Sequence, residues 1–63
     1  MEFKDKLIAA RAKLNLSQEA MARALDVSFA TINRWERGKT NPTKKAELRF
    51  NEFCINNGIK VEL

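Results

Sequence analysis

The side chains in this sequence that could do covalent chemistry are few. The 63 residues include no histidine, no tyrosine and a single cysteine, Cys54. A thiol becomes a nucleophile when a base or cation lowers its pKa, and no histidine is present to activate this one. Zinc sites need several cysteine or histidine ligands, and disulfide frameworks need paired cysteines. We therefore predict a chain that is not an enzyme, binds no metal, cofactor or small-molecule ligand, and keeps Cys54 as a partly buried, inert thiol.

The remaining chemistry is that of positive charge and hydrogen bonding. Twelve lysines and arginines stand against eight aspartates and glutamates, which gives a net charge of +4. Excess positive charge attracts polyanions by releasing their bound counterions. Charge alone leaves nucleic acid at even odds as a partner, because many small basic proteins bind nothing anionic. The positions of the charges must decide.

Helices are the elements that must position these charges. Glycine and proline, which interrupt regular structure, number only two and one. Apolar residues at helical spacing, bounded by capping residues such as Ser17 and Ser28, predict four helices. They span residues 2–14, 18–25, 29–37 and 43–57. The expected fold class is all-α, a compact bundle of four helices, or five.

A single domain is expected over residues 1–63, because a chain this short buries only about 60% of its unfolded surface. The helical core takes up about residues 1–57, and residues 58–63 form a short extended tail whose alternating pattern also permits a strand. No apolar run approaches the roughly 20 residues of a membrane span. The N-terminus is too charged for a signal peptide. A cytoplasmic location without membrane contact is expected.

The second and third predicted helices are short and are separated by a turn of about three residues, 25–27. Ala22 supplies the small side chain that two closely crossing helices need. The third helix begins with small or polar residues at Ser28, Ala30 and Thr31. This pattern indicates a helix-turn-helix, in which the second helix of the motif lies in the major groove of DNA and presents its first residues to base edges.

The residues in and around this motif resemble the helix-turn-helix of the lambda-repressor-like family, which includes phage repressors, Cro and Xre-type bacterial regulators. The similarity covers about residues 7–42. It rests on Leu16-Ser17-Gln18-Glu19, Ala22, Val27-Ser28, the run from Thr31 to Thr40, and Pro42. The resemblance implies sequence-specific binding of double-stranded DNA by a bacterial or phage transcriptional regulator.

The resemblance also implies roles for individual residues. Base contacts are expected from Ser28, Phe29, Ala30, Thr31, Asn33 and Arg34. Phosphate contacts are expected from Ser17, Gln18, Arg37, Lys39, Thr40, Asn41 and Lys44. Arg11 and Glu36 match a structural ion pair between the first and third helices, which orients the third helix and makes no DNA contact.

The sequence departs from the family at the start of the third helix, where many members have polar residues and this chain has Phe29 and Ala30. Apolar side chains can touch the thymine methyl group but cannot make bidentate hydrogen bonds. Arg34 is then the best base reader, with guanine as its preferred target. The alternative for Phe29 is that it contacts no base and either packs against the protein or is simply exposed. Asn15 and Asp26 replace common glycines, and both tolerate a left-handed backbone.

The last predicted helix carries apolar residues on two faces. One face holds Ala46, Phe50 and Phe53. The opposite face holds Leu48 and Ile55, with Ile59 beyond the helix. Burying two aromatic rings stabilises more than burying two aliphatic chains, so we assign the first face to the core. Leu48 and Ile55 then face outward and offer a homodimer contact that forms in solution or on DNA alone, although the reverse assignment of faces stays open.

Three functions compete at this point. The chain is a DNA-binding transcriptional regulator, a DNA-targeting N-terminal domain of a larger DNA-acting protein, or a protein-interaction module that has lost DNA binding. The third class predicts loss of positive charge around the recognition helix, yet Arg34, Arg37, Lys39 and Lys44 remain. The first two classes share every predicted site residue. Lys44, with its neighbour Lys45, is also compatible with a plain solvated helix start.

Overall fold

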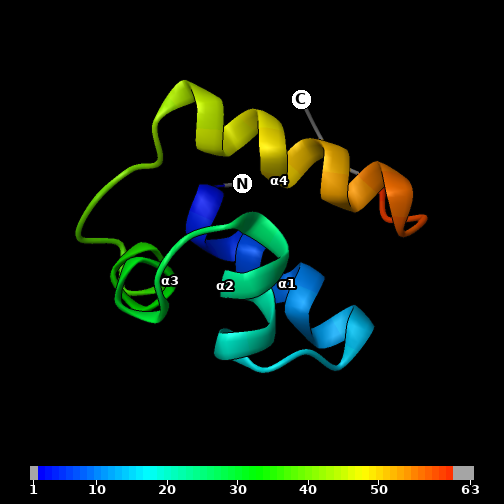
Figure 1. The fold of residues 1–63 in the computed structure, drawn as a ribbon, viewed down its shortest axis with the longest axis horizontal. Helices are drawn as coiled ribbons and strands as arrows, with labels where there is room; N and C mark the ends of the chain where they lie inside the picture. The colour runs from blue at the N-terminus through cyan, green and yellow to red at the C-terminus, as the bar shows by residue number, and fades with distance from the viewer. Residues whose placement is uncertain (1, 61–63) are drawn as a thin grey trace.

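Four α-helices make up the fold of residues 2–60, the part of the chain that the computed structural model describes (Figure 1). They are α1 (Phe3–Leu14), α2 (Gln18–Leu25), α3 (Phe29–Glu36) and α4 (Lys44–Asn56). In Figure 1, α4 crosses one side of the molecule while α1, α2 and α3 lie together on the other. Residues 2–60 contain no strand, so the all-α prediction is confirmed with four helices and no fifth. The end of the alternating tail, residues 61–63, lies outside the described residues.

The helix bounds differ from the sequence prediction by one residue at several ends. Glu2 and Thr43 were placed inside helices, but both have extended backbones and act as N-caps. Arg37 and Asn57 were also placed inside helices and instead form the C-caps of α3 and α4. Cap residues border a helix without adopting its full geometry, which is why spacing alone does not locate them.

Local side-chain chemistry explains where the helices start and stop. Ser17, Ser28 and Thr43 each accept a hydrogen bond from the backbone amide three residues later, at 3.0, 3.1 and 3.2 Å. These bonds satisfy amides that lack an acceptor within the helix. Asn15 and Asp26 close α1 and α2 in the left-handed conformation, with φ of 53° and 57°. The caps predicted at Ser17 and Ser28, and the left-handed turns, are confirmed.

The core joins all four helices. Its buried side chains are Leu7, Ala10, Met21, Ala22, Leu25, Ile32, Trp35, Ala46, Phe50 and Cys54. Phe3 extends it toward the surface, with its ring edge-on to Trp35 at 5.4 Å and to Phe50 at 5.2 Å between ring centroids. The predicted burial of the Trp35 side chain is therefore confirmed.

The orientation of α4 follows the aromatic face. Phe50 is 1% exposed and Phe53 packs against the core, whereas Leu48 and Ile55 are 56% and 71% exposed. The predicted assignment of faces is confirmed for these residues and for Ala46.

Two expectations about the end of α4 were wrong. Ile59 was placed with the outward face, but it packs against the core. Gly58 has a φ of +71°, which turns the chain back so that the amide of Ile59 donates to the carbonyl of Cys54 at 2.8 Å. Cys54 was expected to be partly buried, but its side chain is only 1% exposed. It belongs to the core together with Phe50, and Ile59 packs against that core.

A metal-binding cluster and a membrane-spanning helix are also absent from the described residues. Within residues 2–60, no cluster of three or more histidine, cysteine, aspartate or glutamate side chains could hold a metal ion. None of the four helices is both long enough and apolar enough to cross a membrane.

Candidate nucleic-acid interface

The helix-turn-helix is built from α2, the turn at residues 26–28, and α3. Ala22 is 4% exposed and Ile32 is fully buried, and both belong to the core between these helices. The amide of Val27 donates to the carbonyl of Ala22 at 2.9 Å, which folds the turn back on α2. A small side chain at Ala22 permits this close approach, as the sequence predicted.

One face of α3 points away from the core. Phe29, Ala30, Arg34 and the C-cap Arg37 are exposed, and the buried Ile32 and Trp35 occupy the opposite side of the helix. Phe29 keeps 50% of its surface exposed, so it is not a core residue. An α-helix with its side chains is about 10–12 Å across, close to the width of the DNA major groove at about 12 Å. The exposed face of α3 is therefore narrow enough to enter a major groove.

The polar atoms at the start of α3 are engaged in capping. Ser28 Oγ accepts from the amide of Thr31 at 3.1 Å and forms a second hydrogen bond with the Thr31 hydroxyl at 2.9 Å. Both residues were predicted base contacts. Their mutual hydrogen bond uses the hydroxyl proton of one of the two residues, and beside them the first turn of α3 presents the apolar groups of Phe29 and Ala30.

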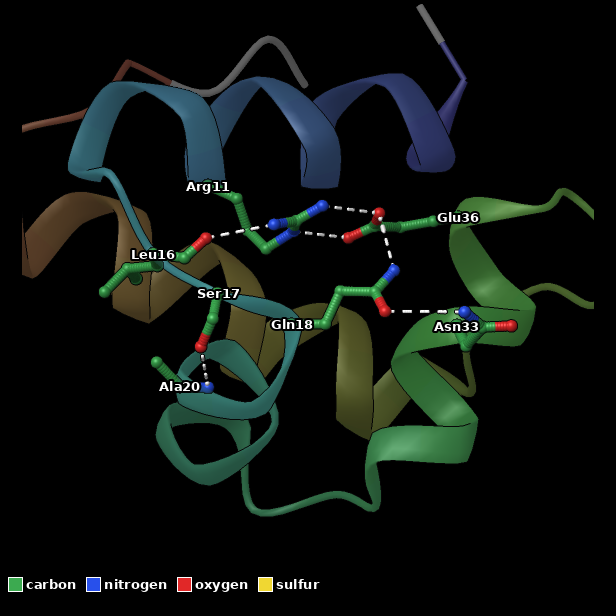
Figure 2. A network of polar contacts seen from close by, with 7 residues as sticks. All are labelled: Arg11, Leu16, Ser17, Gln18, Ala20, Asn33 and Glu36. Carbon is green, nitrogen blue, oxygen red and sulfur yellow. Dashed lines mark hydrogen bonds and ion pairs between the residues drawn. The ribbon is translucent and has the colours of Figure 1, made fainter.

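An ion pair holds α3 against α1 (Figure 2). Arg11 donates from Nε to Glu36 Oε2 at 2.6 Å and from Nη2 to Glu36 Oε1 at 2.8 Å. Its Nη1 donates to the carbonyl oxygen of Leu16 at 3.0 Å. The predicted pair of Arg11 and Glu36 is confirmed, and its forked geometry fixes the direction of α3.

Gln18 connects this pair to α2 and to the exposed side of α3 (Figure 2). Its Nε2 donates to Glu36 Oε1 at 3.1 Å, and its Oε1 accepts from Asn33 Nδ2 at 3.4 Å. The family resemblance predicted a phosphate contact for Gln18 and a base contact for Asn33, but it did not predict that their side chains bind each other. No local pattern signals this contact, because 15 residues separate the two.

The charge state of the network follows from its geometry. Burial alone raises the pKa of Glu36, but hydrogen bonds from Arg11 and Gln18, with the Arg11 charge, outweigh it and hold that pKa below its usual range. The hydrogen bond to Glu36 raises the pKa of Arg11 against an opposing effect of burial. The pair is therefore fully charged near neutral pH and can act as a permanent brace for α3.

The remaining predicted phosphate contacts border α3 on the surface. Ser17 lies at the start of α2, and the segment after α3 holds Lys39, Thr40, Asn41 and, at the start of α4, Lys44, all of them exposed. The sequence did not predict that a cation of α1 lies beside the start of this segment. Lys4 of α1 lies against Gly38, and no local signal could reveal a contact across 34 positions.

Comparison with known proteins agrees with this geometry. The helix-turn-helix family matches residues 7–46, more than half of the chain. This chain belongs to the helix-turn-helix family. No solved structure matches it significantly.

Two relatives in this family are named as regulators. The chain is 44% identical over 53 residues to the HTH-type transcriptional activator BcrR of Enterococcus faecalis, covering 84% of this chain and 26% of that protein. It is 41% identical over 60 residues to the uncharacterized HTH-type transcriptional regulator MJ0272 of Methanocaldococcus jannaschii, covering 95% of this chain and 86% of that protein. The chain thus spans about a quarter of the first relative and most of the second.

Proposed function

We propose that this domain binds double-stranded DNA in a sequence-specific manner, with α3 in the major groove, as the DNA-binding part of a transcriptional regulator. The observation that carries the proposal is the exposed face of α3. The helix is held in place by the hydrogen bonds that Arg11 and Gln18 donate to its last residue, Glu36. The family and the names of both relatives support the same class of function. The work of the domain is binding, with no chemical step.

The side chains on α3 suggest which bases are read. Arg34 is exposed in the last turn of the helix, and its planar guanidinium suits guanine O6 and N7. The exposed Phe29 ring and the Ala30 methyl group suit thymine methyl groups. We therefore expect a half-site that combines thymine near the start of α3 with guanine near its end. Asn33 contributes less to base reading, because Gln18 already binds its amide.

Phosphate contacts would hold the domain in register. Lys39, Thr40, Asn41 and Lys44 would follow one strand beyond the end of α3, together with Arg37. Ser17 stands at the N-terminus of α2, where backbone amides and the helix dipole favour an anion. Such contacts set orientation and affinity but carry no sequence information.

The direct test selects preferred duplexes from a random pool and then titrates variants by fluorescence anisotropy. Arg34→Ala should weaken binding to the selected site by about 1–3 kcal/mol and relax the preference at one base position. Lys39→Ala should weaken binding similarly on all sequences and lower the salt slope by about one unit. If the wild-type chain shows no binding to any duplex at ~50 mM salt, the proposed function is wrong.

We further propose that two copies occupy a palindromic site, in contact through α4. A single recognition helix reads about half of a typical site, and dimers in this class read half-sites roughly 34 Å apart. Leu48 and Ile55 are exposed on the same side of α4, one heptad apart. Sedimentation of the DNA complex should show two chains per palindrome, and Leu48→Glu should reduce it to one. A complex that holds a single wild-type chain would refute this interface.

A second candidate is targeting of a larger protein. The alignment with the Enterococcus activator covers only about a quarter of that protein, so a domain of this kind occurs joined to a much longer chain. In that case the same residues would contact DNA, and the attached segment would supply the effector function. Footprinting with the 63-residue chain tests the DNA contacts that both candidates share.

A further inference from the structure

The first turn of α1 lies against the C-terminal end of α3. The Phe3 ring meets the Trp35 ring at 5.4 Å, which fixes this end of α1 on α3. In Figure 2, the dark-blue N-terminal end of α1 lies on the side of the molecule from which Glu36 projects. The contact brings the residue after Phe3 close to the turn that leaves α3.

Lys4 extends along this turn. A Cβ atom placed on Gly38 would lie 3.2 Å from Lys4 Cδ, 3.4 Å from Lys4 Nζ and 3.8 Å from Lys4 Cε. The Lys4 side chain therefore lies close to the side of Gly38 that a Cβ atom would occupy. Gly38 also has a φ of +72°, so a side chain there would strain the turn and displace Lys4.

The Lys4 ammonium group consequently lies close to Gly38, the residue before Lys39, where the segment with the proposed phosphate contacts begins. The Lys4 side chain keeps 40% of its surface exposed. Among residues 2–60, its ammonium has one acidic neighbour at salt-bridge range, the Glu2 carboxylate at 3.9 Å, and the Glu2 side chain is 79% exposed. A contact this long and this exposed is weak and gives way readily to a phosphate.

A purely structural role would also place a lysine here. The last carbonyl groups of α3 carry partial negative charge, and a cation near a helix C-terminus is favourable. That role would stabilise the fold but would not change how DNA affinity depends on salt. The salt slope therefore separates the two roles.

We propose that Lys4 is a phosphate-contacting residue. It would add a cation from α1 to the proposed phosphate contacts of the segment that follows α3. The inference rests on the proposed function. A DNA strand that passes the end of α3 would meet Lys4 near Gly38 and, at the next residue along the chain, the exposed Lys39. Gly38 is then required for its left-handed turn and for the room that it leaves to the Lys4 stem.

The test uses the whole 63-residue chain and the variant Lys4→Met, which keeps an unbranched stem and removes the charge. Lys13→Met is the matched control, because it removes the same charge from an exposed position nine residues further along α1. Nine residues advance about 13.5 Å and two and a half turns, so Lys13 lies at the other end and on the opposite face of α1. Lys39→Met serves as the positive control.

Loss of one phosphate contact should lower the slope of log affinity against log salt by about 0.9. Lys4→Met should therefore bind about eightfold more weakly than wild type at ~0.1 M salt, with the two affinities converging near ~1 M salt. Lys13→Met should keep the wild-type slope. Glu2→Gln should strengthen binding at low salt, because it removes the competing carboxylate.

The outcomes distinguish this inference from the proposed function. If Lys39→Met loses about 0.9 of the slope and Lys4→Met loses none, Lys4 makes no phosphate contact and the inference is overturned while DNA binding stands. The same holds if Lys4→Met unfolds at lower urea than wild type but keeps its slope, because Lys4 is then only a helix-end partner. Failure of the wild-type chain to bind any duplex would overturn the proposed function itself.

Discussion

Replacement of Arg11 by methionine tests whether α3 is held in place by its ion pair with Glu36. The substitution removes both hydrogen bonds that Arg11 donates to the Glu36 carboxylate, at 2.6 and 2.8 Å. Among residues 2–60, the carboxylate then keeps only the hydrogen bond from the Gln18 amide at 3.1 Å. The Glu36 side chain is 8% exposed, so little water can replace the lost partner. We expect a marked loss of stability.

The magnitude follows from the burial of the two partners. Removal of one member of a buried ion pair costs about 3–5 kcal/mol. The Arg11 side chain is 22% exposed, so water reaches part of the site. We therefore expect a loss below that range or at its lower end, about 2–3 kcal/mol. A domain of this length has a free energy of unfolding of roughly 3–9 kcal/mol. The melting temperature should fall by about 10–20 °C.

Urea denaturation measures this loss, with unfolding monitored by Trp35 fluorescence and by far-ultraviolet circular dichroism. Trp35 is the single tryptophan and is 6% exposed, so its emission reports on the core beside α3. Arg23→Met is the matched control, because Arg23 is exposed on α2 and its loss should change stability by less than about 0.5 kcal/mol. Equal midpoints for the two variants at neutral pH would refute the bracing role of the pair.

The pH dependence gives an independent check. The folded chain holds the pKa of Glu36 below its ordinary value, despite its burial, through hydrogen bonds from Arg11 and Gln18. The stabilisation is therefore present above the ordinary glutamate pKa of about 4.3 and is lost as the pH falls through the folded-state pKa. The stability difference between wild type and Arg11→Met should be full at neutral pH and should shrink in acid. A difference that stays constant down to about pH 3 would show that charge pairing is not its source.

Three further substitutions and one chemical reaction test other parts of the structure. Phe50→Ala should lower the free energy of unfolding, measured in urea, by about 3–5 kcal/mol, because it leaves a cavity in the core. Ile55→Ala should lower it by less than about 0.5 kcal/mol, because Ile55 is exposed. The reverse order would show that the faces of α4 are misassigned. Ser28→Ala should cost about 1 kcal/mol through loss of the N-cap, measured by thermal melting, and should lower the helicity of α3. Burial raises the pKa of the Cys54 thiol, so alkylation at pH 8 should be slow in the folded chain and fast in urea. Equal alkylation rates in the two states would contradict its burial.

The sequence by itself determined the four helices, their order and the position of the helix-turn-helix. These features depend on neighbouring residues. Ser17 and Ser28 bond to amides three positions away, and Asn15 and Asp26 accept the left-handed backbone that ends a helix. The orientation of α4 was also predicted, because Phe50 and Phe53 share one face and the burial of aromatic rings stabilises more than the burial of Leu48 and Ile55 on the other.

Only the tertiary structure decided which distant residues meet. Gln18 meets Glu36 and Asn33 because α2 and α3 cross at Ala22, and Lys4 reaches Gly38 because the Phe3 ring packs on Trp35. Ile59 returns to the core because the chain turns back at the left-handed Gly58. Helical periodicity tells which side of each helix faces inward, but the crossing angle and sliding of one helix on another depend on how whole side chains interlock. That interlocking involves every element at once, so no local stretch of sequence encodes it.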